Sequence, residues 1–382
     1  MRISALLLLT LSMTTMLAQR ARDLGVPFDG TPGPLDAITD VHGVEVGHTT
    51  LISGDGALKV GEGPIRTGVT VLFPRGKSNA DPVYAGWFSQ NGNGEMTGTT
   101  WIEESGFLEG PLAITNTHSV GVVRDAIIAW SLKHPMFHQD WSLPVVAETW
   151  DGWLNDINGF HVKPEHVFQA LDGAQSGAVP EGGVGGGTGM VCYGFKGGIG
   201  TASRVLAKED GSYTVGVLVQ CNCGRRPQLM IAGVPVGKEI TEDVPYSMYK
   251  DDAAGAHQGD QGSIIIIVAT DAPLIPTQLK RLARRATMGL ARTGSVSGNG
   301  SGDIFLAFST ANAHANDDPG PNTVRTVANM RISPLFSATV EATEEAIVNA
   351  MVGAKTMTGI DGHTVPGLPH EQLQQVLKKY GR

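Results

Sequence analysis

The pattern of apolar positions predicts a buried strand followed by an amphipathic helix in the second half of the chain. Residues 262–270 are mostly β-branched and show no polar alternation, which is typical of a strand covered on both faces. Residues 276–292 follow, with leucines and alanines on one helical face and arginines on the other. We expect this helix to stop at Gly294.

The other patterned segments are shorter, and some have the pattern of a helix while others have the pattern of a strand. A final long helix is expected at about 340–354, with small and apolar residues facing inward. Further strands are predicted at 68–73, 112–114, 190–195, 213–219 and 304–308, and further helices at 125–132 and 165–171. Because strands and helices come in mixed clusters, the pattern favours a layered α/β fold whose sheets are covered by helices.

The composition favours one large domain. The 382 residues are 41% hydrophobic and 17% charged, so there is enough apolar material for a substantial core. No low-complexity run, repeat or long linker divides the chain. A net charge of −9 argues against nucleic acid as a partner, since a phosphate-binding surface needs clustered lysines and arginines. Residues 233–238 are one residue too short for a phosphate loop, so nucleotide binding is not indicated.

The amino terminus has the pattern of a secretory signal. Arg2 precedes a mostly apolar run at 5–11, and the small residue Ala18 precedes a polar stretch. We therefore expect residues 1–18 to be a signal peptide, 19–382 to be the mature chain, and the protein to be periplasmic or secreted. The apolar run is too short to span a membrane, so no anchor is expected after its removal. An apolar strand at the amino terminus is the alternative.

Three cysteines, Cys192, Cys221 and Cys223, are spread over 32 residues. Their count is odd and the Cys-x-Cys spacing gives poor disulfide geometry, so we expect buried free thiols in strands. None of the 11 histidines supplies a partner at the spacing of a zinc site. The sequence therefore predicts neither a metal nor a cofactor.

A glycine-rich hexapeptide at 298–303 runs directly into the predicted strand at 304–308. Ser301 carries the hydroxyl of this segment and lies between flexible glycines and a rigid strand. Such a position suits a nucleophile, and it also suits a strained peptide bond that is cleaved. The alternative interpretation is a tight loop between a helix and a strand. A nucleophile elbow is not indicated, because Asn299 occupies the position of the first glycine in Gly-x-Ser-x-Gly.

Seven segments, one of which overlaps this hexapeptide, occur in a recognisable order between about Val41 and Gly353. They are Trp-Ile-Glu-Glu-Ser-Gly at 101–106, Thr-Asn-Thr-His-Ser-Val-Gly at 115–121, the glycine-rich run at 181–190, and the segments at 196–204, 269–274, 300–304 and 342–347. Taken together, they resemble the serine aminopeptidases of the L-aminopeptidase/D-esterase and β-peptidyl aminopeptidase family. The resemblance spans nearly the whole mature chain and is more specific than any single motif.

The resemblance implies a four-layer αββα sandwich like that of N-terminal-nucleophile hydrolases. It also implies that the precursor cuts itself between Gly300 and Ser301, leaving a large subunit at 19–300 and a small subunit at 301–382. The small subunit would have 82 residues (382 − 300). The family typically assembles as a homo-oligomer of such heterodimers. Its substrates would be peptides, amino-acid amides or esters, and the preferred amino terminus stays open.

The expected chemistry centres on a serine that becomes N-terminal. A serine hydroxyl is a weak nucleophile and needs an adjacent base, and the freed α-amine of Ser301, with a pKa of about 8, is such a base. Glu344 is the candidate carboxylate for orienting this centre; its alternative role is to complement a helix dipole near the start of the final helix. The family often has a serine two positions earlier, where this chain has Ala342, and Thr339 or Thr343 is the candidate replacement.

Three more residues are assigned candidate roles, Tyr193 and Glu181 by the resemblance and Asn222 by the chemistry of its amide. Tyr193 and Asn222 are candidate donors to the oxyanion, although a core tyrosine and a turn asparagine are the alternative interpretations. Glu181 is the candidate that binds the substrate ammonium, because a carboxylate in a partly dry pocket forms strong charge-assisted hydrogen bonds. Glu103 and Glu104 are weaker candidates for that role.

Three competing functions stay open from the sequence. A Ser-His-Asp hydrolase would use Ser301 with His118 or His314 and would leave the chain uncut. A self-processing acyltransferase has a similar architecture, but that class uses threonine as nucleophile and is cytoplasmic. A non-catalytic extracytoplasmic binding protein would use the glycine loops only to shape a ligand pocket.

Overall fold

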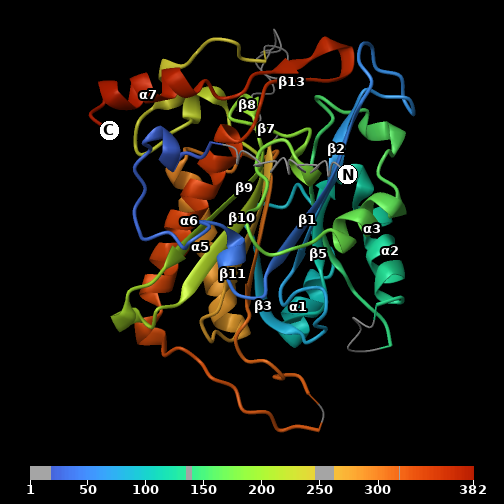
Figure 1. Ribbon diagram of the computed structural model, residues 1–382, viewed down its shortest axis with the longest axis vertical. Coiled ribbons are helices and arrows are strands. Elements are labelled where there is room, and N and C mark those ends of the chain that lie inside the picture. Colours follow the sequence, from blue (N-terminus) through green and yellow to red (C-terminus); the bar gives the residue numbers. More distant parts are fainter. Residues whose placement is uncertain (1–18, 135–139, 246–261, 318) are drawn as a thin grey trace, which may run out of the picture.

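Two sheets stacked face to face form the centre of the protein, which is described from a computed structural model covering residues 19–134, 140–245, 262–317 and 319–382 (Figure 1). The predicted signal peptide at 1–18 lies outside these described residues. The smaller sheet has the order β1-β2-β5-β6, with strands Glu45–Ser53, Ile65–Phe73, Leu112–Asn116 and Val145–Thr149. The larger sheet has the order β4-β3-β12-β11-β10-β9, with strands Phe107–Leu108, Val83–Ser89, Gly302–Ser309, Ser263–Thr270, Thr214–Asn222 and Gly198–Val205.

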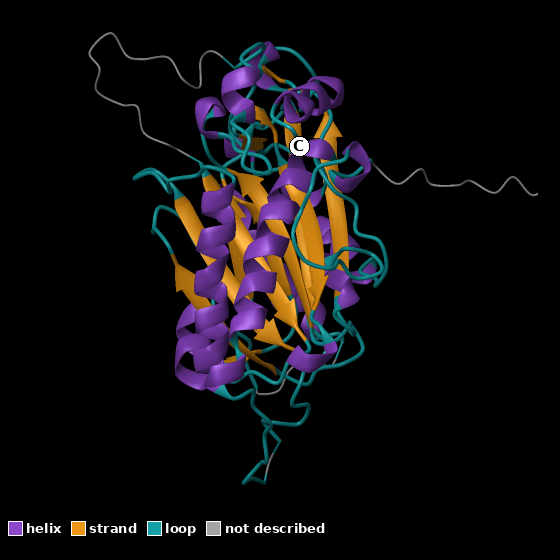
Figure 2. Ribbon diagram, turned by 90° about the vertical axis from the view of Figure 1, so that its left-hand side faces the viewer, coloured by secondary structure: helices purple, strands orange, loops and turns teal. Residues whose placement is uncertain are grey.

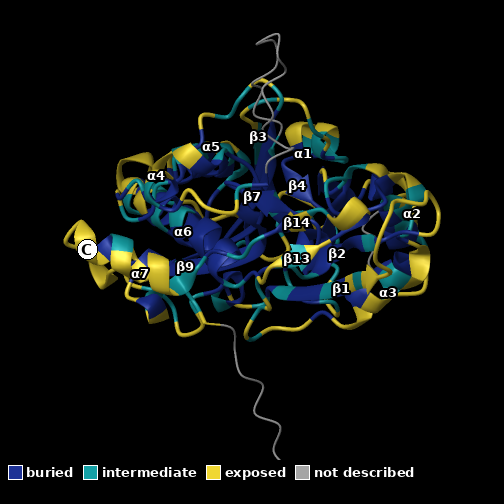
Figure 3. Ribbon diagram, turned by 90° about the horizontal axis from the view of Figure 1, so that it is seen from above, coloured by how far each residue is buried: buried dark blue, intermediate teal, exposed yellow. Residues whose placement is uncertain are grey.

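Helices cover the outer face of each sheet. The helices α5 (Pro276–Arg292) and α6 (Ser333–Val352) lie side by side across the larger sheet (Figure 2). The helices α2 (Val120–Ser131) and α3 (Pro164–Asp172) cover the smaller sheet, so that the buried strands lie between two groups of helices (Figure 3). The shorter helices are α1 (Thr99–Ser105), α4 (Val236–Glu239) and α7 (His370–Lys379). The predicted four-layer αββα sandwich is therefore confirmed.

Three apolar cores hold the layers together. One lies between α5, α6 and the larger sheet and includes Phe305 and Ala346. The second lies between the two sheets and includes Leu306 and Ile114, and the third joins the smaller sheet to α2 and α3. Strand β11 is buried along its whole length, as its unbroken β-branched run predicts, because it has a core on each face.

The position of the predicted nucleophile follows from one parallel strand pair. Strands β11 and β12 run parallel with Ser263 opposite Gly302, and α5 makes the crossover that a parallel pair requires. Gly86 lets α5 approach the sheet closely, because a Cβ at this position would clash with the backbone nitrogen of Lys280. As a result, Ser301 lies at the sheet edge where β12 begins, beside the end of α5.

Several predicted boundaries differ from the structure. The final long helix, α6, begins at Ser333, seven residues before the predicted start, because Pro334 is tolerated in a first helical turn. The predicted strand at 190–195 is a short hairpin of β7 (Val191–Cys192) and β8 (Phe195–Lys196). Its two turn residues, Tyr193 and Gly194, both have positive φ, as a tight hairpin turn requires. A second small hairpin pairs β13 (Met357–Thr358) with β14 (Thr364–Val365).

Within the described residues, no helix is both long and apolar enough to cross a membrane.

Candidate active site

Ser301 lies in a tight turn at the start of β12, with the peptide bond to Gly300 intact. Its backbone N–H donates to the carbonyl of Gly298 at 2.9 Å, which closes the turn. Its side chain is buried, and its hydroxyl donates to Asp303 Oδ1 at 2.8 Å. Gly300 itself is only half-buried, so the carbonyl of the expected scissile bond lies near the surface. The turn therefore holds a buried hydroxyl next to a peptide bond that water can reach.

The loop after β3 clamps this turn from the other side. Asn91 Nδ2 donates to the carbonyls of Ser297 and Gly298 at 3.1 and 2.9 Å, and Asn91 Oδ1 accepts from the Asp303 N–H at 2.7 Å. Asn93 Nδ2 donates to the Gly300 carbonyl at 2.8 Å, and the Asn93 N–H donates to the Ser301 carbonyl at 3.2 Å. The carbonyl on which a self-cleaving serine must act thus has an amide donor aimed at it.

Asn222 is brought to the same end of the larger sheet as Ser301. It lies at the end of β10 opposite Ser263, whose hydroxyl accepts from the Gly302 N–H at 3.1 Å. Its Oδ1 accepts from the Val191 N–H at 2.8 Å, and its Nδ2 donates to the Trp150 carbonyl at 3.0 Å. Because a primary amide has two N–H donors, this fixed side chain has the chemistry expected of an oxyanion donor.

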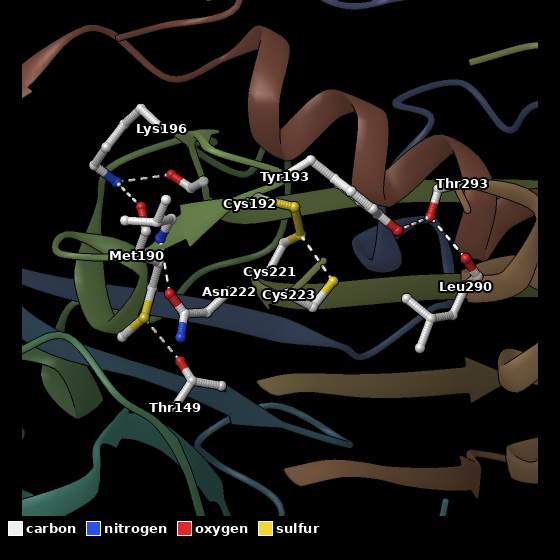
Figure 4. Close-up of a disulfide and its surroundings, with 12 residues drawn as sticks. Thr149, Met190, Cys192, Tyr193, Lys196, Cys221, Asn222, Cys223, Leu290 and Thr293 are labelled. Atoms are coloured by element: carbon white, nitrogen blue, oxygen red, sulfur yellow. Dashed lines mark hydrogen bonds between the residues drawn. A yellow bond between two sulfur atoms is a disulfide. The ribbon is translucent and has the colours of Figure 1, made fainter. Parts of the chain in front are cut away.

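Tyr193 is placed differently from the prediction. Its side chain is fully buried, and its hydroxyl shares a 2.8 Å hydrogen bond with the hydroxyl of Thr293 (Figure 4). Thr293 caps the end of α5, eight residues before Ser301. The phenol therefore anchors the start of the loop that leads to Ser301, while the side chain that donates to the Gly300 carbonyl is that of Asn93.

Glu181, the residue expected to bind the substrate amine, is paired with another charged side chain of the protein. Its carboxylate accepts from Arg20 Nε at 2.8 Å and from the Thr201 N–H at 2.8 Å. Thr201 belongs to the edge strand β9, which three strand spacings separate from β12. Burial raises the pKa of Glu181 and the Arg20 charge opposes that effect. Both carboxylate oxygens are thus committed to an internal ion pair.

Glu344 bonds to Arg292, the last residue of α5, and not to Ser301 in the described residues. It is in the middle of α6, eleven residues after the first, so the alternative role at a helix start is wrong. Its carboxylate pairs with Arg292 at 3.0 Å near the surface, and burial raises its pKa. Thr339 and Thr343 each donate to the carbonyl four residues earlier in the helix, at 2.8 and 2.7 Å. These contacts keep the three side chains within or beside α6.

A buried carboxylate that the sequence analysis missed lies close to Gly302, the residue after Ser301. Glu148, in β6 and 3% exposed, accepts from the Glu95 N–H at 3.0 Å and from the Thr117 hydroxyl. A Cβ on Gly94 would lie 3.1 Å from Gly302 Cα and 3.3 Å from Glu148 Oε1, so Gly94 lies between Gly302 and Glu148. Burial raises the pKa of Glu148. Glu148 belongs to the smaller sheet and Ser301 precedes β12 of the larger sheet, so the local sequence gave no signal that they lie close together.

Neither histidine of the competing triad is the hydrogen-bond partner of the Ser301 hydroxyl in the described residues. His314 follows the far end of β12, on an exposed segment where it pairs with Asp317 at 3.1 Å. A strand of eight residues places the two ends of β12 about 25 Å apart. The ring of His118 stacks on Phe160, 5.9 Å between ring centroids. The hydrogen-bond acceptor of the Ser301 hydroxyl is a carboxylate, not an imidazole.

The cysteines were predicted to be free thiols, and for two of them this prediction is wrong. Cys192 and Cys221 form a disulfide that ties the β7–β8 hairpin to β10 (Figure 4). Their Cα atoms are 5.8 Å apart although 29 residues separate them in the sequence. Because the pairing depends on the fold, the Cys-x-Cys spacing could not reveal it. Cys223 is also buried, with its sulfur 3.9 Å from that of Cys221.

The match to a family model decides the classification. The model of peptidase family S58 matches residues 36–365. This chain belongs to peptidase family S58. It is therefore a serine aminopeptidase, and the resemblance read from its sequence segments is confirmed.

Relatives and solved structures agree with this classification. The enzyme is 57% identical to "Beta-peptidyl aminopeptidase BapA" of Sphingosinicella microcystinivorans, over 95% of this chain and 93% of that protein. It is 50% identical to the protein of the same name from Sphingosinicella xenopeptidilytica, over 97% and 94% of the two chains. Among solved structures, the L-aminopeptidase D-Ala-esterase/amidase of Ochrobactrum anthropi, a variant of the Ntn hydrolase fold, is 48% identical with a TM-score of 0.87 and coverage of 95% and 99%. A Burkholderia sp. β-aminopeptidase is also 48% identical, with a TM-score of 0.84 and coverage of 95% and 99%.

Proposed function

We propose that this protein is an exported serine aminopeptidase that cuts itself between Gly300 and Ser301 and then uses Ser301 as an N-terminal nucleophile. One observation carries the proposal: the buried Ser301 hydroxyl is held at the start of β12, in a turn whose Gly300 carbonyl has its own donor. Cleavage there would release an α-amine at the nucleophile itself, with a pKa of about 8. No histidine is then required as base.

In the cut enzyme, two further groups have fitting chemistry for peptide hydrolysis. Asn222, fixed by Val191 and Trp150, would donate to the developing oxyanion. Glu148, buried beside Gly94, would accept the ammonium of the substrate. An ammonium bound at Glu148 would place the first residue of the substrate near Ser301 and would exclude blocked amino termini.

We propose β-amino-acid amino termini as the preferred substrates. The support is the name of the two relatives at 57% and 50% identity, both β-peptidyl aminopeptidases. L-α-amino-acid amides and D-alanine esters are the second candidates, supported by the activities for which the Ochrobactrum anthropi enzyme, 48% identical, is named. A β-amino acid has one more backbone carbon than an α-amino acid, so its carbonyl lies farther from its ammonium. A pocket that fixes the distance between the bound ammonium and the Ser301 hydroxyl would therefore favour one of these substrate classes over the other.

Export and assembly complete the proposal. A signal-like segment at 1–18 and a disulfide between Cys192 and Cys221 both suit an oxidising, extracytoplasmic location. Assembly as a homo-oligomer of cut heterodimers rests on the resemblance to the family.

A panel of substrates tests the proposed function. The purified enzyme is incubated with the p-nitroanilides of a β-homoamino acid, an L-α-amino acid and the N-acetylated β-homoamino acid, and with a D-alanine ester. We expect kcat/KM to be highest for the free β-homoamino acid and turnover of the acetylated compound to be absent. Hydrolysis of the acetylated compound at a similar rate would contradict an aminopeptidase, and a preference for the α-compound would contradict the substrate class.

A further inference from the structure

In the uncut chain, the nucleophile and the proposed oxyanion donor of peptide hydrolysis face opposite sides of the larger sheet. Asp303 lies on the same face of β12 as Phe305 and Ala307, which belong to the core under α5 and α6. Its contact with the Ser301 hydroxyl directs that hydroxyl to the same face. Asn222, by strand alternation, shares its face with Leu218, which belongs to the core between the sheets.

We propose that self-cleavage uses its own pair of catalytic groups, Asp303 and Asn93, which differ from the groups that serve peptide hydrolysis. Asp303 is the general base for Ser301, since its Oδ1 accepts the hydroxyl proton at 2.8 Å. Asn93 is the oxyanion donor, since its Nδ2 donates to the Gly300 carbonyl at 2.8 Å. The inference rests on the proposed self-processing and assigns the residues that perform it.

The reaction balances with water as the only co-reactant. Ser301 Oγ forms a bond to the carbonyl carbon of Gly300 as its proton passes to Asp303, and the carbonyl electron pair moves to the oxygen held by Asn93. The C–N bond of the tetrahedral intermediate then breaks, and the proton on Asp303 passes to the departing nitrogen. This leaves an ester between Gly300 and the Ser301 oxygen, with a free α-amine. Water attacks the ester carbon and its C–O bond breaks, which restores the serine hydroxyl and leaves a Gly300 carboxylate.

The contacts around the turn agree with separate catalytic groups for self-cleavage. Asn91 holds both sides of the turn, at Ser297 and Gly298 and at the Asp303 N–H, so the reacting groups are fixed before any cut. The half-buried position of Gly300 gives water access to the ester. The α-amine cannot serve as base at this stage, because it is still the amide nitrogen and donates to Gly298. A separate base is therefore required before cleavage.

The experiment follows the conversion of newly made full-length chain into two fragments by denaturing gel, using cell-free synthesis and a chase. Asp303→Asn keeps the shape and removes the base, and we expect cleavage to slow by about 100-fold or more. Asn93→Asp keeps the shape and removes the N–H donor, with an expected slowing of about 100-fold. Gln90→Glu is the matched control: it adds the same charge to the same exposed loop, and its side chain bonds only to Thr287 in the described residues. It should cleave at the wild-type rate.

A second substitution separates a base from a merely structural carboxylate. A cysteine thiol, with a pKa of about 8.5, is partly ionised without help. Ser301→Cys combined with Asp303→Asn should therefore cleave about 10-fold or more faster than Asp303→Asn alone, with the gain rising with pH. Wild-type cleavage rates in Asn93→Asp or Asp303→Asn, or no gain from the cysteine, would overturn the assignment. A wild-type chain that stays uncut would instead overturn the proposed function.

Discussion

Replacing Glu148 by Gln should weaken hydrolysis of substrates with a free amino terminus while the fold is kept. The Glu148 side chain is 3% exposed and already accepts from the Glu95 N–H and the Thr117 hydroxyl. A carboxylate has about four acceptor positions, so two stay available for an ammonium. The Gln side chain has the same shape and can keep a bond to the Glu95 N–H, but it has no charge.

The size of the effect follows from the burial of this carboxylate. A hydrogen bond to a charged group contributes about 1.5–3 kcal/mol, and about 1.36 kcal/mol corresponds to a factor of ten. We therefore expect kcat/KM for a free amine to fall by about 10- to 150-fold, mainly through KM. The matched control is Glu103→Gln, which removes a carboxylate that is 53% exposed and pairs with Lys280 at the surface. This control should leave kcat/KM unchanged.

The pH profile gives a second readout for the same residue. Burial raises the pKa of Glu148, and only the ionised form binds an ammonium. Binding should therefore be lost, as pH falls, at a higher pH than for an ordinary glutamate, and Glu148→Gln should remove this acidic limb of kcat/KM. Unchanged kcat/KM for the free amine in Glu148→Gln would refute the assignment. An equal loss with a substrate that lacks the amine would show a structural role instead.

Two stability measurements test a buried ion pair and a buried histidine. Glu181→Gln removes one partner of the ion pair with Arg20, and we expect the free energy of unfolding in urea to fall by about 3 kcal/mol with KM unchanged; a raised KM at unchanged stability would restore Glu181 as a substrate ligand. His48 lies in β1 and shares a 2.9 Å hydrogen bond with the Thr70 hydroxyl, and burial lowers its pKa to about 4. Between pH 6.5 and 4 the unfolded chain therefore binds a proton that the folded chain does not, so stability is lost as the pH falls. His48→Gln should reduce this loss by about 2 kcal/mol between pH 7 and 4.5, and an identical slope in both proteins would contradict the burial of a neutral imidazole.

Local periodicity was enough to predict a layered α/β fold and the elements around Ser301, whereas the four-layer arrangement was implied by the resemblance to the family. The unbroken apolar run of β11 and the two-faced pattern of α5 each determine one element, and both agree with the structure to within a residue. The start of α6 was missed because Pro334 is compatible with a first helical turn as well as with a loop. Such boundaries depend on packing that the local pattern does not contain.

The candidate site was only partly predictable, because its parts are distant in the sequence. Ser301 and Asn222 follow from short motifs at the ends of strands that the fold brings together. The contact of Asn93 with Gly300 spans 207 residues, and Asn-Gly pairs by themselves indicate only turns. For Glu181 the local motif was also insufficient. This carboxylate stands beside a glycine-rich run, but it is paired with Arg20, which is 161 residues away in the sequence. A charge in a motif does not show whether another charge already neutralises it.

The most direct test of the account is the amino-terminal sequence of the fragments of the purified wild-type protein. The account predicts two chains on a denaturing gel, the smaller of 82 residues (382 − 300) and beginning Ser-Gly-Asp-Ile at Ser301. Ser301→Ala should give a single uncut mature chain without peptidase activity, because the substitution removes the attacking hydroxyl and the nucleophile of the cut enzyme. An active wild-type enzyme that runs as one intact chain, or a Ser301→Ala protein cut normally at this bond, would contradict the central claim.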